Sequence, residues 1–213
     1  LSRELQIRND PVQDVLEVAR PIALSFVNES RPPVNLKYLR CHRERPFREL
    51  RKLAEKGSTL ELVAAFDAQP ELAKDPIEMA QVMHVASLKG RSETVGSLLE
   101  IGIDPNQAAP YKEGCIFQNL MITPLCIALK KGHQDTADIL LRGGAVYDVF
   151  SAAYLGDITA VAEMTAKNPD LTYTSDPAND FLQTTPLHHA IYGGHIDVVE
   201  LLVERERQRS WQE

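Results

Sequence analysis

The chain has 213 residues, with 23 Lys and Arg against 30 Asp and Glu, which gives a formal net charge of −7. A chain of this length can fold without disulfides or a structural metal, and its acidic balance argues against nucleic acid as the main ligand. No apolar run approaches the ~20 residues that cross a bilayer, so we expect no membrane association. The three cysteines, at 41, 115 and 126, are too widely spaced for a disulfide framework or a zinc site. They favour a reducing location, cytoplasmic or nuclear.

Residues 1–36 are predicted to form an N-terminal helical segment that ends in a linker. Each of two short stretches, 11–19 and 21–27, begins with a proline, a residue common at the first position of a helix. The Arg-Pro-Pro run at 31–33 then breaks the helical pattern.

A basic stretch follows at residues 37–52, with seven Lys and Arg against two Glu. Such a cluster could dock an acidic peptide, a phosphate or a nucleic acid. The alternative is a solvated helix face that pairs with the acidic remainder of the chain. The candidate patch consists of four arginines, Arg40, Arg43, Arg45 and Arg48.

The rest of the chain contains an internal repeat. The clearest copy runs from Thr185-Pro186-Leu187-His188-His189-Ala190 to Gly194-His195, and a second runs from Thr123-Pro124-Leu125-Cys126-Ile127-Ala128 to Gly132-His133. Weaker copies end at Gly57, Gly90 and Gly156. Thr suits a helix N-cap, Pro suits the first helical position, and Gly suits the left-handed turn that ends a helix. Each copy therefore predicts a short helix closed by a glycine.

A second helix is predicted after each of these glycines. Five residues past them stand Leu62, Val95, Ala137, Val161 and Val199, and eight residues past them stand Ala65, Leu98, Leu140, Met164 and Leu202. This spacing places one apolar face on each second helix. The units are thus helix-turn-helix pairs that bury apolar faces against their neighbours.

The copies are similar to the T-P-L-H-x-A…G-H signature of the ankyrin-repeat family, and the chain resembles that family over residues 47–206. The resemblance implies an all-α solenoid, occupying 37–213, with an N-terminal helical cap. It implies a binding scaffold as well. The implied units lie near 47–76, 80–110, 122–146, 147–175 and 184–206, with a C-terminal helical cap over 204–213.

The spacing between units is uneven. Successive turn glycines are 33, 42, 24 and 38 residues apart, where the family repeats every ~33 residues. The long intervals predict extended loops near 104–122 and 172–183, which contain Tyr111 and Phe181. The short interval leaves no room for a projecting hairpin before the fourth unit.

In the ankyrin family the two residues before the glycine of each first helix face the concave groove. This resemblance predicts that Tyr154 and Tyr192 are aromatic anchors and that Lys130 and Lys131 select acidic groups. The alternative is that the tyrosines merely pack against neighbouring loops. His189, at a variable and partly exposed position in the family, could also touch a ligand. The predicted partner-binding residues are Leu88, Lys89, Lys130, Lys131, Tyr154, Leu155, His189, Tyr192, Tyr111 and Phe181.

Catalysis is not expected. No P-loop, metal-binding or nucleophile motif occurs in the chain, and the adjacent Cys41 and His42 lack an orienting third group. Four histidines, His84, His133, His188 and His195, fall at positions that the family uses structurally. We therefore expect no catalytic residue, no metal and no cofactor.

The sequence predicts a scaffold that binds another protein or peptide rather than a small molecule. One alternative is a targeting or regulatory segment of a larger multidomain enzyme or of a bacterial effector, which would act in the host cytosol. A second is the binding of an acidic ligand or nucleic acid through residues 37–52.

Overall fold

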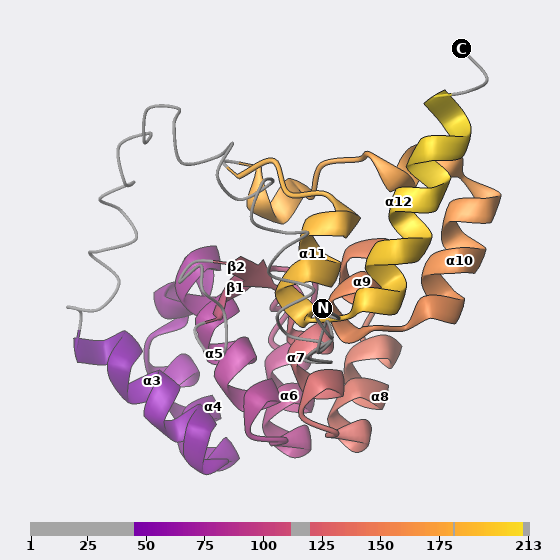
Figure 1. Ribbon diagram of the computed structural model, residues 1–213. Coiled ribbons are helices and arrows are strands. Elements are labelled where there is room, and N and C mark those ends of the chain that lie inside the picture. Colours follow the sequence, from indigo (N-terminus) through magenta and orange to yellow (C-terminus); the bar gives the residue numbers. More distant parts are fainter. Residues whose placement is uncertain (1–44, 112–119, 181, 211–213) are drawn as a thin grey trace, which may run out of the picture.

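The computed structural model describes residues 45–111, 120–180 and 182–210 and consists of five stacked helix pairs (Figure 1). The pairs follow one another along the chain from indigo to yellow in Figure 1. They are α3 (Arg45–Lys56) with α4 (Thr59–Ala68), α5 (Pro76–Leu88) with α6 (Ser92–Glu100), α7 (Pro124–Lys130) with α8 (Gln134–Arg142), α9 (Val149–Leu155) with α10 (Ile158–Lys167), and α11 (Pro186–Gly193) with α12 (Ile196–Ser210). The helices predicted over 11–19 and 21–27 lie outside the described residues.

Each pair is joined at the predicted glycine. Gly57, Gly90, Gly132, Gly156 and Gly194 have φ between 65° and 80°, the left-handed region in which a side chain is strained. In all five pairs, the amide of the residue after the glycine bonds back into the first helix, as Asp157 N does to Ala152 O at 2.9 Å. The five predicted turns are therefore confirmed.

Three of the first helices, α5, α7 and α9, begin at a side chain that caps them. Thr123 Oγ1 accepts a hydrogen bond from Cys126 N, and Asp148 Oδ1 accepts one from Ser151 N. The helix α5 begins at Pro76 because Asp75 caps it, accepting bonds from the amides of Ile77 and Glu78. The second unit was predicted to begin near residue 80, and this boundary is wrong because α5 begins four residues earlier. The helix α5 therefore has 13 residues, whereas α7 has 7.

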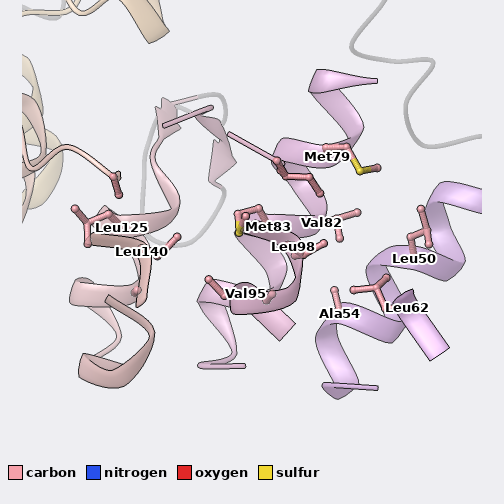
Figure 2. Close-up of a cluster of buried hydrophobic side chains, with 14 of the residues drawn as sticks. Leu50, Ala54, Leu62, Met79, Val82, Met83, Val95, Leu98, Leu125 and Leu140 are labelled. Atoms are coloured by element: carbon pink, nitrogen blue, oxygen red, sulfur yellow. The ribbon is translucent and has the colours of Figure 1, made fainter. Parts of the chain in front are cut away.

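The core lies between the two helix layers, where apolar residues of successive units meet (Figure 2). The predicted second-helix positions Leu62, Val95 and Leu98 are fully buried there against Met79 and Met83 of α5. Residues Ala137, Leu140, Val161 and Leu202 are buried as well, whereas Ala65, Met164 and Val199 are half-buried. The repeated apolar face predicted from the spacing is therefore the surface that joins the units.

The loop predicted near 104–122 contains two short strands, β1 (Ala109–Tyr111) and β2 (Leu120–Ile122), which pair antiparallel. The loop before the last unit contains the short 3-10 helices η2 (Pro169–Thr172) and η3 (Pro177–Asn179), and a third, η1 (Pro70–Lys74), follows α4. Asn179 of η3 is bonded to the backbone of Met121 in β2, 58 residues earlier. The two insertions therefore pack against each other.

Candidate partner-binding face

Six of the predicted site residues form one surface at the ends of the first helices. Leu88, Leu155 and Tyr192 are half-buried, and Lys89, Lys130 and Lys131 are exposed. The three half-buried side chains pack on a single buried cluster made by β1, β2, α7 and α9. We call this surface the first-helix row: Leu88, Lys89, Lys130, Lys131, Leu155 and Tyr192.

Tyr154 and Tyr111 lie beneath the row rather than on it. Their exposed fractions are 1% and 3%, because the strand pair β1–β2 folds over α7 and α9 and shares one cluster with both rings. The prediction that Tyr154 is an anchor for a partner is therefore wrong, and so is the assignment of Tyr111 to a projecting contact. The alternative, in which Tyr154 packs against a neighbouring loop, is what the structure shows.

Lys130 is held above these two rings. Its Nζ donates a hydrogen bond of 2.6 Å to Tyr154 Oη and lies 4.0 Å from the centroid of that ring and 5.7 Å from the Tyr111 centroid. The electron-rich face of a tyrosine attracts a cation. The charge of Lys130 is thus placed at a defined point on the surface.

At the start of the row, Lys89 Nζ lies 3.1 Å from Glu55 Oε1 in an exposed ion pair. Exposed pairs of this kind contribute little to stability, because water screens them and two long side chains must be ordered. Lys89 therefore keeps most of its ability to meet an incoming carboxylate.

His189 is also wrongly predicted, because it is 2% exposed and faces inward. Its Nε2 lies 2.9 Å from Asp176 Oδ2 and 3.3 Å from Thr184 Oγ1. Burial alone would raise the pKa of Asp176, but the hydrogen bonds from His189 and Asn179 hold that pKa below its ordinary value. Sequence reasoning missed Asp176 and Asn179, and the only signal for them was the length of the interval in which they stand.

A pocket of about 360 Å³ opens next to this network, where the fourth unit has no hairpin of its own. Its lining includes Cys126, Phe150, Asp176 and His189. The Cys126 thiol is 1% exposed, and its burial raises its pKa to about 12. Such a thiol is not a nucleophile at neutral pH. Within the described parts of the chain, no three His, Cys, Asp or Glu side chains are grouped as metal ligands.

Two of the remaining histidines have structural roles, as predicted, one within its own unit and one between units. His188 Nδ1 accepts a 3.0 Å hydrogen bond from Thr185 N at the start of α11. His133 Nε2 lies 3.2 Å from Leu88 O in the preceding unit. His84 is buried beside the backbone of Ile122, but among the described residues neither of its ring nitrogens makes a hydrogen bond of regular geometry.

The basic stretch is partly used inside the fold. Arg51 Nη1 lies 2.6 Å from Glu78 Oε2, a carboxylate that is 4% exposed, and Lys52 pairs with Glu49 at 2.9 Å. Of the predicted patch, Arg48 is exposed and Arg45 begins α3. Arg40, Arg43 and the loop residue Phe181 lie outside the described residues.

The stacked helix pairs, their left-handed glycine turns and the histidine contacts between units define an ankyrin-repeat solenoid. Residues 83–210 match the family model for ankyrin repeats, in three copies, and the chain belongs to the ankyrin-repeat family. Ankyrin-repeat domains generally bind other proteins. None of the described helices is both long and apolar enough to span a membrane.

A curated relative comes from Oryza sativa subsp. japonica and is described as probable E3 ubiquitin-protein ligase XBOS31. The two proteins are 26% identical over 167 residues, which make up 78% of this chain and 29% of the relative. The chain therefore spans less than a third of the length of this relative.

Proposed function

We propose that this chain is a non-enzymatic interaction module that binds a segment of another protein through the first-helix row. The observation that carries the proposal is the continuity of the row over four units. The exposed lysines lie in the second and third units, and half-buried Leu155 and Tyr192 continue the row over the fourth and fifth. Leu88, Leu155 and Tyr192 all rest on one buried cluster. A preformed surface of this kind loses little conformational entropy when it binds.

The absence of catalysis is part of the proposal. The buried Cys126 thiol and the inward-facing His189–Asp176 pair are the reactive groups nearest to the pocket, and each has a structural partner or environment that keeps it from a substrate. A buried, unpaired thiol also fits a reducing compartment, and we include a cytoplasmic location in the proposal.

Affinity capture from a host lysate tests the row. The double variant Leu155→Ala/Tyr192→Ala should lose a partner that the parent chain retains, because truncated apolar side chains remove the central contacts of an interface. Leu141→Ala is the matched control, since Leu141 is exposed on α8, in the other helix layer. Equal capture by the parent and the folded double variant would overturn the proposal.

A second candidate is a substrate-recruiting segment of a larger enzyme. It is favoured by the relative, which is described as a probable ubiquitin ligase. The region that matches this chain makes up only 29% of that protein. The test is to express the complete product of the native transcript and assay it for self-ubiquitination. Recruitment would be supported if mutation of the row leaves self-ubiquitination intact but abolishes ubiquitination of the captured partner. A complete product without ubiquitination activity would refute it.

A further inference from the structure

Acidic side chains are more frequent in the outer layer, formed by the second helices, than in the first helices. Each of α4, α6 and α8 has two exposed acidic residues, and α12 has four acidic residues beside three arginines. The first helices α7, α9 and α11 have no acidic residue, while α3 has two and α5 has one. The acidic residues of these four outer helices are Glu61, Asp67, Glu93, Glu100, Asp135, Asp138, Asp197, Glu200, Glu204 and Glu206.

The first-helix row holds three lysines, Lys89, Lys130 and Lys131, of which Lys89 is paired with Glu55. The other cations of the first helices lie on α3. Lys130 is held in place by the Tyr154 hydroxyl and by two ring faces. A cation that is already ordered loses less entropy when it meets a carboxylate than one on a mobile side chain.

From this distribution of charge we propose that the partner of the row is an acidic protein segment that also carries apolar side chains. The inference rests on the proposed function, since it names the chemistry of the partner at the same site. Lys130 and Lys131 would meet its carboxylates, while the half-buried Leu155 and Tyr192 would meet its apolar groups. The acidic outer layer would repel the same segment and orient its approach.

A defined probe tests this chemistry directly. The probe is a fluorescein-labelled peptide of repeated Glu-Glu-Leu, compared by anisotropy with peptides in which Gln or Lys replaces every Glu. The Glu peptide should bind the parent chain and weaken as salt is added, because exposed charges are screened. The Lys peptide should not bind. Binding of the Gln peptide as tight as that of the Glu peptide would overturn the proposal.

Charge-matched variants locate the site. Lys130→Gln/Lys131→Gln should weaken binding of the Glu peptide about tenfold, equivalent to ~1.4 kcal/mol. Lys74→Gln/Lys167→Gln removes the same charge from exposed lysines of η1 and α10 and should leave binding unchanged. Equal weakening by the two double variants would mean that only net charge matters and would overturn the proposal.

Tyr154→Phe tests the positioning of Lys130. The variant keeps the buried ring and both lysines but removes the hydroxyl that lies 2.6 Å from Lys130 Nζ. Binding of the Glu peptide should weaken severalfold, while binding of the Gln peptide should not change. If the Tyr154 hydroxyl contributes only to stability, the variant will change the melting temperature but keep the full preference for the Glu peptide over the Gln peptide. That result would contradict the positioning of Lys130 by Tyr154.

Two outcomes separate this inference from the proposed function. If a captured partner depends on Leu155 and Tyr192 but not on Lys130 and Lys131, the row is an interface and the acidic partner is wrong. If a single-stranded DNA oligonucleotide binds more tightly than the Glu peptide with the same dependence on Lys130 and Lys131, the ligand is a nucleic acid and both proposals fail.

Discussion

The side chain of Asn179 exchanges two hydrogen bonds with the backbone of Met121. Met121 N donates to Asn179 Oδ1 and Asn179 Nδ2 donates to Met121 O, both at 2.8 Å, and Asn179 is completely buried. The carboxamide thus imitates one residue of a third strand on the outer edge of β2. On the other strand, Pro110 has no N–H to offer. Both edges of the pair are therefore protected against further strand addition.

Asn179→Ala should lower the free energy of unfolding by about 3 kcal/mol, because it leaves two backbone groups of Met121 without their partner and removes one of the two hydrogen bonds to Asp176 Oδ2. Urea unfolding measures the change. Asn106→Ala is the control, since Asn106 makes the same exchange with Gly144 O and Val146 N but is exposed. Water can replace its bonds, so a loss of only about 1 kcal/mol is expected. Equal losses would contradict the importance of burial at Asn179.

The neighbours Gly193 and Gly194 should differ in their response to substitution. A Cβ on Gly193 would overlap the carbonyl oxygen of Tyr154, because α11 packs closely on α9 at this point. Gly193→Ala should therefore lower stability by about 2 kcal/mol or more through a forced backbone shift. Thermal unfolding gives the comparison.

Gly194 has space around it but a φ of +80°, so strain rather than contact sets its response. Gly194→Asn should lower stability by less than about 1 kcal/mol, since Asn tolerates the left-handed region. Gly194→Val should lower it by more, because a branched side chain resists positive φ. Equal melting temperatures for the Asn and Val variants would contradict this account of the turn.

The repeat positions could be predicted from sequence because each depends on local chemistry. A glycine with positive φ, a threonine at an N-cap and an apolar residue on one helix face require no knowledge of distant residues, and all were recognised. The exposure of the tyrosines could not be predicted in this way. Tyr192 remains half-exposed whereas Tyr154 is covered by β1 and β2, and that cover comes from an insertion with no counterpart in the other units.

His84 and His188 occupy the same position of the repeat, but they differ in hydrogen bonding because their helices begin at different points. His188 bonds to Thr185 because α11 begins at Pro186, which leaves the Thr185 amide available. In the second unit the helix begins earlier, at Pro76, so that Gln81, the residue three before His84, lies inside α5. Its amide belongs to the helix, and His84 is left without the partner that its place in the repeat implies.

The ion pair between Arg51 and Glu78 should show strong coupling. Arg51→Met would remove the Arg51 cation from the buried Glu78 carboxylate and should lower stability by about 3 kcal/mol. The double variant Arg51→Met/Glu78→Met should lose much less, because apolar side chains of similar size can fill the space between α3 and α5. A double-mutant cycle in urea measures the coupling. Simple additivity of the two single changes would show that the pair is not a unit.

His84 should make the fold sensitive to mild acid. Burial lowers its pKa to about 4, and the nearby backbone of Ile122 opposes that shift only in part. The unfolded chain, with an ordinary value of 6.5, binds more protons between these two values. Stability should therefore fall as the pH drops from about 6.5 to about 4, by about 3 kcal/mol in all. The contribution of Asp176, whose pKa is lowered, is present above 3.8 and is lost only in stronger acid.

His84→Leu should remove most of this fall and leave the smaller part due to His188, whose pKa burial also lowers. It should also raise stability at pH 7 by about 1 kcal/mol, because a buried imidazole without a regular hydrogen bond is replaced by an apolar side chain. Urea unfolding at a series of pH values measures both effects. His133→Leu is the control, since it loses the contact with Leu88 O and should be less stable than the parent at pH 7 by about 1 kcal/mol. If His84→Leu keeps the fall between pH 6.5 and 4, the acid sensitivity arises elsewhere in the chain.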